Sequence, residues 1–152
     1  MSIAKVDTVE LYYEQHGSGA PLLLIMGLAA DSMAWLFQVP EFSKHYRTIV
    51  FDNRGVGRSS KPAGPYTISQ MADDTAGLLD VLGIARTHVV GVSMGGMIAQ
   101  ELALRHPRLV GGLVLACCMP PRCPLPTASP PHARLPGCIR RWRAEAVPVA
   151  SS

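Results

Sequence analysis

The sequence predicts an α/β domain of three layers, an αβα sandwich with a mostly parallel sheet between helices. Continuous apolar runs of strand length alternate with runs whose apolar residues recur at helical spacing, in the order β, α, β, α, β, α, β. Parallel strands joined by helices form right-handed crossovers, which place helices on both faces of the sheet. A glycine-containing turn at residues 91–96 lies between one of these strands and the next helix.

The chain begins with two short β-type runs, Ile3 to Val6 and Val9 to Gln15, which Asp7-Thr8 separates. They predict an N-terminal hairpin. Residues 21–26 follow as a continuous apolar run of the kind found in a strand buried on both faces. Gly27 closes that strand.

A short helix and a second buried strand are expected next. Asp31 or Ser32 can cap a helix that reaches residue 42, and Pro40 is expected to break it or divide it into two pieces. Residues 47–52 form the strand, and an irregular loop follows it.

The clearest helix begins after Thr67, which forms a capping box with Gln70, and its apolar residues recur at helical spacing up to Gly83. Residues 88–92 then predict a strand, and residues 94–106 predict a helix that ends before a proline.

Composition excludes several classes of protein. Hydrophobic residues make up 48% and charged residues 16%, and a net charge of +3 is too small to suggest a nucleic-acid partner. The longest apolar run, residues 20–30, is much shorter than the roughly 20 residues that span a bilayer. The start does not resemble a secretory signal, so we expect a cytoplasmic protein without membrane contact. The cysteines lack zinc-site spacing, and we expect free thiols, no metal and no cofactor; they are Cys117, Cys118, Cys123 and Cys138.

The turn Gly91-Val92-Ser93-Met94-Gly95-Gly96 is typical of a nucleophile elbow. Such a turn exposes the serine hydroxyl above the carboxyl end of the sheet, and only glycine at 91 and 95 allows strand and helix to approach so closely. Gly96 is expected to support the turn together with these two glycines. Ser93 is therefore the candidate nucleophile.

A serine hydroxyl is a weak nucleophile, so acyl transfer needs an adjacent base and donors for the oxyanion that develops. The backbone N–H of Met94, the first residue after the serine, is one candidate donor. The strand end at Gly27 offers the N–H of Leu28 as the other. Two such donors would form an oxyanion hole.

Two glycine-containing segments could also be interpreted as nucleotide-binding motifs. Residues 91–96 also follow a strand and begin a helix, as a dinucleotide fingerprint does, but that motif needs glycine where Ser93 stands. Gly55-Val56-Gly57 precedes a proline-containing loop and not a helix, so phosphate binding is not expected there.

Three segments carry a resemblance to a known family. They read P-L-L-L-I-M-G-L from Pro21, Y-R-T-I-V-F-D-N-R-G-V-G-R-S from Tyr46, and H-V-V-G-V-S-M-G-G-M-I-A-Q-E-L-A-L-R-H-P from His88. Over about residues 3–118 the chain resembles the N-terminal half of an α/β-hydrolase. The most similar branch is that of 3-oxoadipate enol-lactonases, carboxylesterases and cofactor-free haloperoxidases.

This resemblance implies an incomplete α/β-hydrolase fold and a serine hydrolase acting on a small ester or lactone. It implies Ser93 as the nucleophile, Met94 and Leu28 as the oxyanion donors, and residues 52–59 as a mainly structural loop. Many relatives have histidine where this chain has Met26, which leaves the substrate open.

The resemblance also implies that the triad acid and histidine follow later strands, which this chain lacks. Helical rise puts His106 about 20 Å from the serine, and strand rise puts His88 about 16 Å away. His16 and His45 are expected at the opposite end of the sheet. His132 is the one histidine whose distance the sequence leaves undetermined, and we expect no catalytic role for it. The chain alone is therefore expected to be nearly inactive.

Composition changes near Cys118. Residues 1–118 hold nine Lys/Arg, ten Asp/Glu and five of the 13 prolines, whereas residues 119–152 hold five Arg, one Glu and eight Pro. We expect a partial hydrolase domain over residues 1–118 and a Pro/Arg-rich tail, disordered or non-homologous, over residues 119–152. Out-of-frame or alternatively spliced coding would explain the tail, and a genuine linker or interaction tail is the alternative.

The last apolar run, residues 110–117, predicts a strand covered on both faces, with no later strand to pair its outer edge. An apolar open edge favours oligomers, aggregates or a partner. A second function therefore stays open beside hydrolysis, namely a non-catalytic fragment or pseudoenzyme that binds a partner through this edge.

Overall fold

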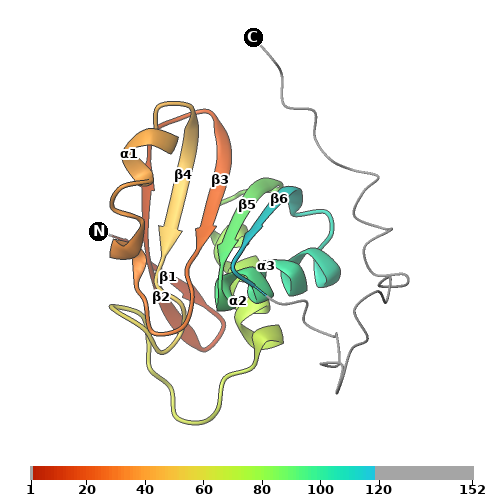
Figure 1. The fold of residues 1–152 in the computed structure, drawn as a ribbon. Helices are drawn as coiled ribbons and strands as arrows, with labels where there is room; N and C mark the ends of the chain where they lie inside the picture. Colours follow the sequence, from red (N-terminus) through yellow and green to blue (C-terminus); the bar gives the residue numbers. More distant parts are fainter. Residues whose placement is uncertain (1, 119–152) are drawn as a thin grey trace, which may run out of the picture. The chain divides into compact units, whose positions relative to one another are not determined.

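The computed structural model describes residues 2–118, which contain a six-stranded sheet with helices on both sides (Figure 1). The predicted tail lies outside the described residues, and so do Cys123, His132 and Cys138. The elements are β1 Ser2–Val6, β2 Val9–His16, β3 Ala20–Ile25, the 3-10 helix η1 Ser32–Trp35, α1 Val39–Phe42, β4 Tyr46–Phe51, α2 Ile68–Val81, β5 Thr87–Val92, α3 Met94–Arg105 and β6 Val110–Ala116.

The sheet has the strand order β1-β2-β4-β3-β5-β6. β1 and β2 form the predicted hairpin, with Val6 opposite Val9, and β2 is also antiparallel to β4. The pairs β3–β4, β3–β5 and β5–β6 are parallel. The prediction of a mostly parallel sheet with an N-terminal hairpin is confirmed. Because parallel strands share one direction, the loops after β3, β4, β5 and β6 leave from the same edge of the sheet.

Two hydrophobic clusters cover the two faces of the sheet, which confirms the three layers. The smaller cluster packs β3 and β4 against η1 and α1, around Leu22, Leu24, Trp35 and Val50. The larger cluster packs the other face against α2 and α3, and among its fully buried members are Leu11, Leu23, Ile25, Ile49, Leu78, Leu79, Val89, Ile98 and Leu102.

The short helical segment after β3 is divided in two, as Pro40 predicts. Asp31 caps the first piece, η1, because its Oδ1 accepts a hydrogen bond from the Met33 N–H at 3.0 Å. The second piece, α1, has Pro40 in its first turn, where the missing N–H costs nothing.

The longer helices begin and end as the sequence predicts, to within a residue or two. Thr67 caps α2 by accepting a hydrogen bond from the Gln70 N–H at 3.1 Å, and Gly83 has a φ of 65° just beyond its end. α3 ends at Arg105, immediately before His106 and Pro107. No helix in residues 2–118 is long and apolar enough to cross a membrane.

β6 differs from its prediction. None of its residues is buried, and Val114 and Leu115 are 58% and 39% exposed. The expectation of a strand covered on both faces was wrong, since no residue of β6 is buried. Its open outer edge was expected, because β6 is the last strand in the sheet order and pairs, within the described residues, with β5 alone. Its apolar composition therefore lies at an edge of the sheet and not in its centre.

Candidate active site

Ser93 lies at the junction of β5 and α3 with its backbone in a conformation that serine rarely adopts. Its φ of 57° and ψ of −125° fall outside the regions that are easily accessible to non-glycine residues, a strain of roughly 1–3 kcal/mol. The Ser93 N–H donates to the Ala116 carbonyl at 2.9 Å, and the Ser93 carbonyl accepts from the Gly96 N–H at 2.9 Å. The backbone is thus held from both sides while Ser93 stays exposed.

The glycines of the turn are required by close contacts. A methyl group at Gly91 would lie 2.5 Å from the Gly95 carbonyl oxygen, and one at Gly95 would lie 2.2 Å from the carbonyl oxygen of Ile25. At Gly96 it would lie 2.6 Å from the sulfur of Cys118. These glycines therefore let α3 approach the ends of β3 and β6 closely enough to form the elbow.

The loop after β3 contacts the serine directly. A methyl group on Gly27 would lie 3.0 Å from Ser93 Cβ and 3.3 Å from Ser93 Oγ. Leu28, the next residue, is 76% exposed at the start of this loop. Met94 is the first residue of α3, and the first N–H groups of a helix have no acceptor within it. Gly27 is thus close to Ser93, which is distant from it in sequence, and to the end of the sheet where Met94 begins α3.

The loop after β4 is held by a buried carboxylate. Asp52 is fully buried, and its Oδ1 accepts from the Ser32 N–H at 2.7 Å while its Oδ2 accepts from the Arg58 N–H at 2.8 Å. Ser59 Oγ donates to the Asp52 carbonyl at 2.6 Å and accepts from the Tyr12 N–H at 2.9 Å. Because every polar group here has an internal partner, these residues act as a scaffold for the neighbouring loops.

Two further side chains of this loop reach other elements. Asn53 Nδ2 donates to the Met26 carbonyl at 3.0 Å, at the end of β3. Arg54 forms a buried two-pronged ion pair with Asp74 of α2, in which Nη2 lies 2.5 Å from Oδ1. The hydrogen bonds that Arg54 donates to the Asp74 carboxylate raise the pKa of the Arg54 guanidinium. Sequence reasoning missed both partners, since no local spacing relates residue 53 to 26 or 54 to 74.

Tyr12, Glu14 and Arg58 form a second polar group, beside the loop after β4. The Tyr12 hydroxyl donates to Glu14 Oε1 at 2.5 Å, and the Arg58 guanidinium lies 3.4 Å from the centre of the Tyr12 ring. Burial raises the pKa of Tyr12, and its hydrogen bond lowers the pKa of Glu14. Local spacing does not predict the part that Arg58 plays, because Arg58 reaches Tyr12 and Glu14 of β2 from the loop after β4.

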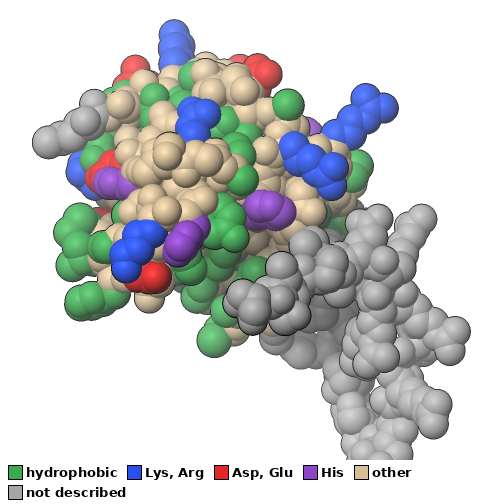
Figure 2. All heavy atoms as spheres, turned by 90° about the horizontal axis from the view of Figure 1, so that it is seen from above, with side chains coloured by type: hydrophobic (Ala, Val, Ile, Leu, Met, Phe, Trp, Pro, Cys, Tyr) green, Lys and Arg blue, Asp and Glu red, His purple; other side chains and the backbone are tan. Residues whose placement is uncertain are grey.

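The four described histidines lie away from Ser93. Strand register puts His16 opposite Thr48 and His88 opposite Leu22, near the amino ends of β4 and β3. His45 immediately precedes β4, and His106 follows α3. β3 and β4 point downward in Figure 1, so Figure 2 looks onto their amino ends, and histidine side chains are visible on that face.

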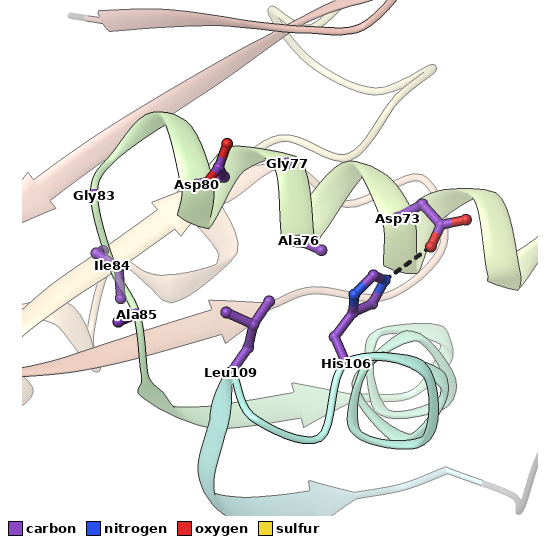
Figure 3. A pocket seen from close by; sticks show the side chains of 9 residues that line it. All are labelled: Asp73, Ala76, Gly77, Asp80, Gly83, Ile84, Ala85, His106 and Leu109. Atoms are coloured by element: carbon purple, nitrogen blue, oxygen red, sulfur yellow. Dashed lines mark hydrogen bonds and ion pairs between the residues drawn. The ribbon is translucent and has the colours of Figure 1, made fainter.

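A cavity beside α2 and α3 also lies away from the serine. It has a volume of about 530 Å³ and is lined by Asp73, Ala76, Gly77, Asp80, Gly83, Ile84, Ala85, His106 and Leu109 (Figure 3). His106 Nε2 lies 2.9 Å from Asp73 Oδ1, and hydrogen bonds from Arg105 and His106 lower the pKa of Asp73. Because His106 follows the last turn of α3 and Ser93 precedes its first, this cavity belongs to the opposite end of the domain.

Residues 2–118 contain no group of side chains arranged to hold a metal ion.

Comparison with known proteins identifies relatives over the same segment. A sequence model of the alpha/beta hydrolase fold matches residues 20–150. The RutD protein of Azorhizobium caulinodans, named as a carbamate hydrolase, is 38% identical over 76% of this chain. The BpoC protein of Mycobacterium tuberculosis, named as a non-heme bromoperoxidase, is 44% identical over 70% of it. The crystal structure of the enol-lactonase from Burkholderia xenovorans LB400 superposes with a TM-score of 0.69 and 40% identity over 72% of the chain.

The matched segment is less than half of each relative. It covers 43% of the RutD protein, 41% of the BpoC protein and 45% of the enol-lactonase chain.

Proposed function

The chain belongs to the α/β-hydrolase fold family, and from this premise we propose that it is a serine hydrolase acting on a small ester or lactone. Ser93 is the proposed nucleophile, with the N–H groups of Met94 and Leu28 as oxyanion donors. The observation that carries the proposal is the strained turn at Ser93, whose hydroxyl oxygen lies 3.3 Å from the point where a Gly27 side chain would begin. Strain of this kind persists only where the surrounding structure maintains it.

The proposed reaction begins with attack of Ser93 Oγ on the acyl carbonyl. A bond forms between Oγ and the carbonyl carbon, the bond to the alcohol oxygen breaks, and the hydroxyl proton passes through a base to the leaving alcohol. Water then attacks the acyl carbon, its hydroxyl group stays with the released acid, the bond to Oγ breaks, and the proton that the water loses restores the Ser93 hydroxyl. The two N–H groups would hold the oxyanion in both steps, an effect worth about a hundredfold to a thousandfold for each donor.

The base for this reaction has no candidate among the described residues. A base must come within about 3 Å of the serine or reach it through one water, whereas the histidines of residues 2–118 lie at the other end of the sheet. Removing the base from a serine protease costs about a millionfold in turnover. We therefore expect slow acylation of Ser93 and very weak turnover unless a histidine is supplied from outside residues 2–118.

A second candidate function follows from β6. Its uncharged sequence, Val-Gly-Gly-Leu-Val-Leu-Ala, and its exposed Val114 and Leu115 favour pairing with another strand. The alternative proposal is a non-catalytic hydrolase-like fragment that binds a partner through this edge.

Labelling with a fluorophosphonate probe tests the hydrolase proposal. The full chain, Ser93→Ala and Ser18→Ala are incubated with the probe and with p-nitrophenyl acetate, and the modified residue is located by mass spectrometry. Ser18 lies in the exposed loop between β2 and β3, at the opposite end of the sheet, so its replacement controls for unspecific labelling. Modification of Ser93 that survives Ser18→Ala and disappears in Ser93→Ala is the expected result.

Size-exclusion chromatography distinguishes the hydrolase proposal from the proposal of a partner-binding fragment. An edge that pairs with another strand predicts oligomers or aggregates that Val114→Lys disperses, because a charged side chain interrupts the apolar edge. A monomeric wild-type chain without labelling at Ser93 would contradict both proposals, and a monomer labelled at Ser93 would leave only the hydrolase.

A further inference from the structure

The proposed function depends on a short backbone segment that carries no functional side chain. Residues 26–32 lead from β3 to η1 and include Gly27, which contacts Ser93, and Leu28, the proposed oxyanion donor. A backbone N–H stabilises an oxyanion only if it is held in place before the reaction begins. The residues that hold this segment are therefore part of the proposed chemistry, although they touch no substrate.

Asn53 holds the beginning of the segment. Its Nδ2 donates to the Met26 carbonyl at 3.0 Å, and Asn53 is only 2% exposed. The same carbonyl faces α3 on another side, because a methyl group at Gly95 would lie 2.8 Å from it. Since the peptide unit is planar, fixing the Met26 carbonyl also fixes the plane of the Gly27 N–H. The orientation of the next peptide, which carries the Leu28 N–H, then depends only on the two backbone torsions of Gly27.

Asp52 holds the end of the segment. Its Oδ1 accepts from the Ser32 N–H at 2.7 Å, and its Oδ2 is occupied by the Arg58 N–H at 2.8 Å. Gly57, with a φ of 51°, makes room for this carboxylate, because a methyl group there would lie 2.1 Å from Oδ2. Two adjacent side chains at the end of β4 thus bind the two ends of one loop.

We propose that Asn53 and Asp52 are positioning residues that clamp residues 26–32, with Asn53 setting the orientation of the Leu28 N–H toward the oxyanion at Ser93. This inference rests on the proposed function for its chemical consequence, while the clamp itself is a property of the loop. Loss of the Asn53 amide leaves the Met26 carbonyl without this partner and frees the peptide before Gly27. The loop then spends less time in the arrangement that holds an oxyanion.

The test compares Asn53→Ala with Ser59→Ala in the full chain. Ser59 is buried in the same loop, and its hydroxyl makes two hydrogen bonds, to Asp52 and Tyr12, but none to residues 26–32. A merely structural role predicts that both variants lose stability and that neither alters Ser93 selectively. The clamp predicts that Asn53→Ala alone slows fluorophosphonate labelling of Ser93 about tenfold to a hundredfold, less than the loss of a whole oxyanion donor. Equal labelling rates in the two folded variants would overturn the inference.

An NMR measurement keeps the inference separate from the proposed function. Asn53→Ala should lower the order parameters of the Gly27 and Leu28 amides from about 0.85 toward 0.6, and Ser59→Ala should not. If Ser93 of the wild type is not labelled at all, the proposed function fails, and the order parameters alone test the clamp. Order parameters of Gly27 and Leu28 that are the same in Asn53→Ala as in the wild type would overturn it. Asn53→Asp, which keeps the side-chain shape and removes the donor, replaces Asn53→Ala if the latter does not fold.

Discussion

Substitution of Gly95 by alanine is expected to destabilise the domain although alanine is the better helix former. The new methyl group would lie 2.2 Å from the Ile25 carbonyl oxygen and 2.8 Å from that of Met26. Both contacts are with backbone atoms of a buried strand end, so α3 must move by roughly 1 Å. Overpacking of this kind costs about 1–3 kcal/mol or more, against a gain of about 0.5–1 kcal/mol for replacing glycine within a helix. Contacts this short with backbone atoms place the cost near the upper end of its range, so we expect a net loss of about 2 kcal/mol.

Gly111→Ala is the matched control. The added methyl group would lie 3.3 Å from Arg86 Nε, the end of a flexible side chain that can move aside. We expect its free energy of unfolding to stay within about 0.5 kcal/mol of the wild type, as for most substitutions away from special features. Urea denaturation followed by circular dichroism measures both variants. In thermal unfolding the difference should be about 8 °C, at roughly 4 °C per kcal/mol for a domain of this size.

A Gly95→Ala variant as stable as Gly111→Ala would refute this expectation. A Gly95→Ala variant that kept the wild-type labelling rate at Ser93 would contradict a movement of α3, because such a movement must shift the turn at Ser93 relative to Gly27.

Two further predictions concern the polar contacts around the loop after β4. Arg54→Leu should lower the free energy of unfolding by about 3–5 kcal/mol, because it leaves the buried Asp74 carboxylate unpaired; Arg54→Leu/Asp74→Leu should recover much of this in urea denaturation, and a double variant no more stable than the single would contradict it. Tyr12→Phe removes the hydrogen bond that lowers the pKa of Glu14. At pH values above the unfolded pKa of Glu14, it should therefore lower the free energy of unfolding by about 1 kcal/mol. The difference from wild type should disappear as pH falls through the folded pKa of Glu14, because the bond stabilises the ionised carboxylate, and a difference that persists in acid would exclude this origin.

Local signals predicted most of the fold. The hairpin at Asp7, the cap at Thr67 and the division of the helical segment before Pro40 each depend on residues a few positions apart, and all three are confirmed. The elbow was predicted for the same reason, since its glycines and Ser93 lie within six residues. What these glycines touch was not predictable, because Ile25 reaches Gly95 only through the sheet.

The features that sequence reasoning missed depend on pairs that are distant in the chain. Asn53 looks like any polar loop residue until β4 and β3 are paired, and the Arg54–Asp74 ion pair needs α2 to pack on the sheet. β6 was misjudged for the opposite reason. Its open edge was expected, but its apolar composition is that of a strand covered on both faces, and composition does not reveal that its side chains stay partly exposed.

The strand order has a consequence for how the site forms during folding. Gly27 and Ser93 meet only when β3 pairs with β5, in a register that joins residues 22–25 to residues 88–91. That pairing bypasses β4 and α2, which lie between these strands in the chain. Contacts of such long sequence separation form slowly, because the entropy of closing the loop is lost before the contact is gained. We therefore expect the hairpin and α2 to acquire structure first and the elbow to be completed late, so that recovery of Ser93 reactivity would trail the recovery of helical signal in a refolding experiment.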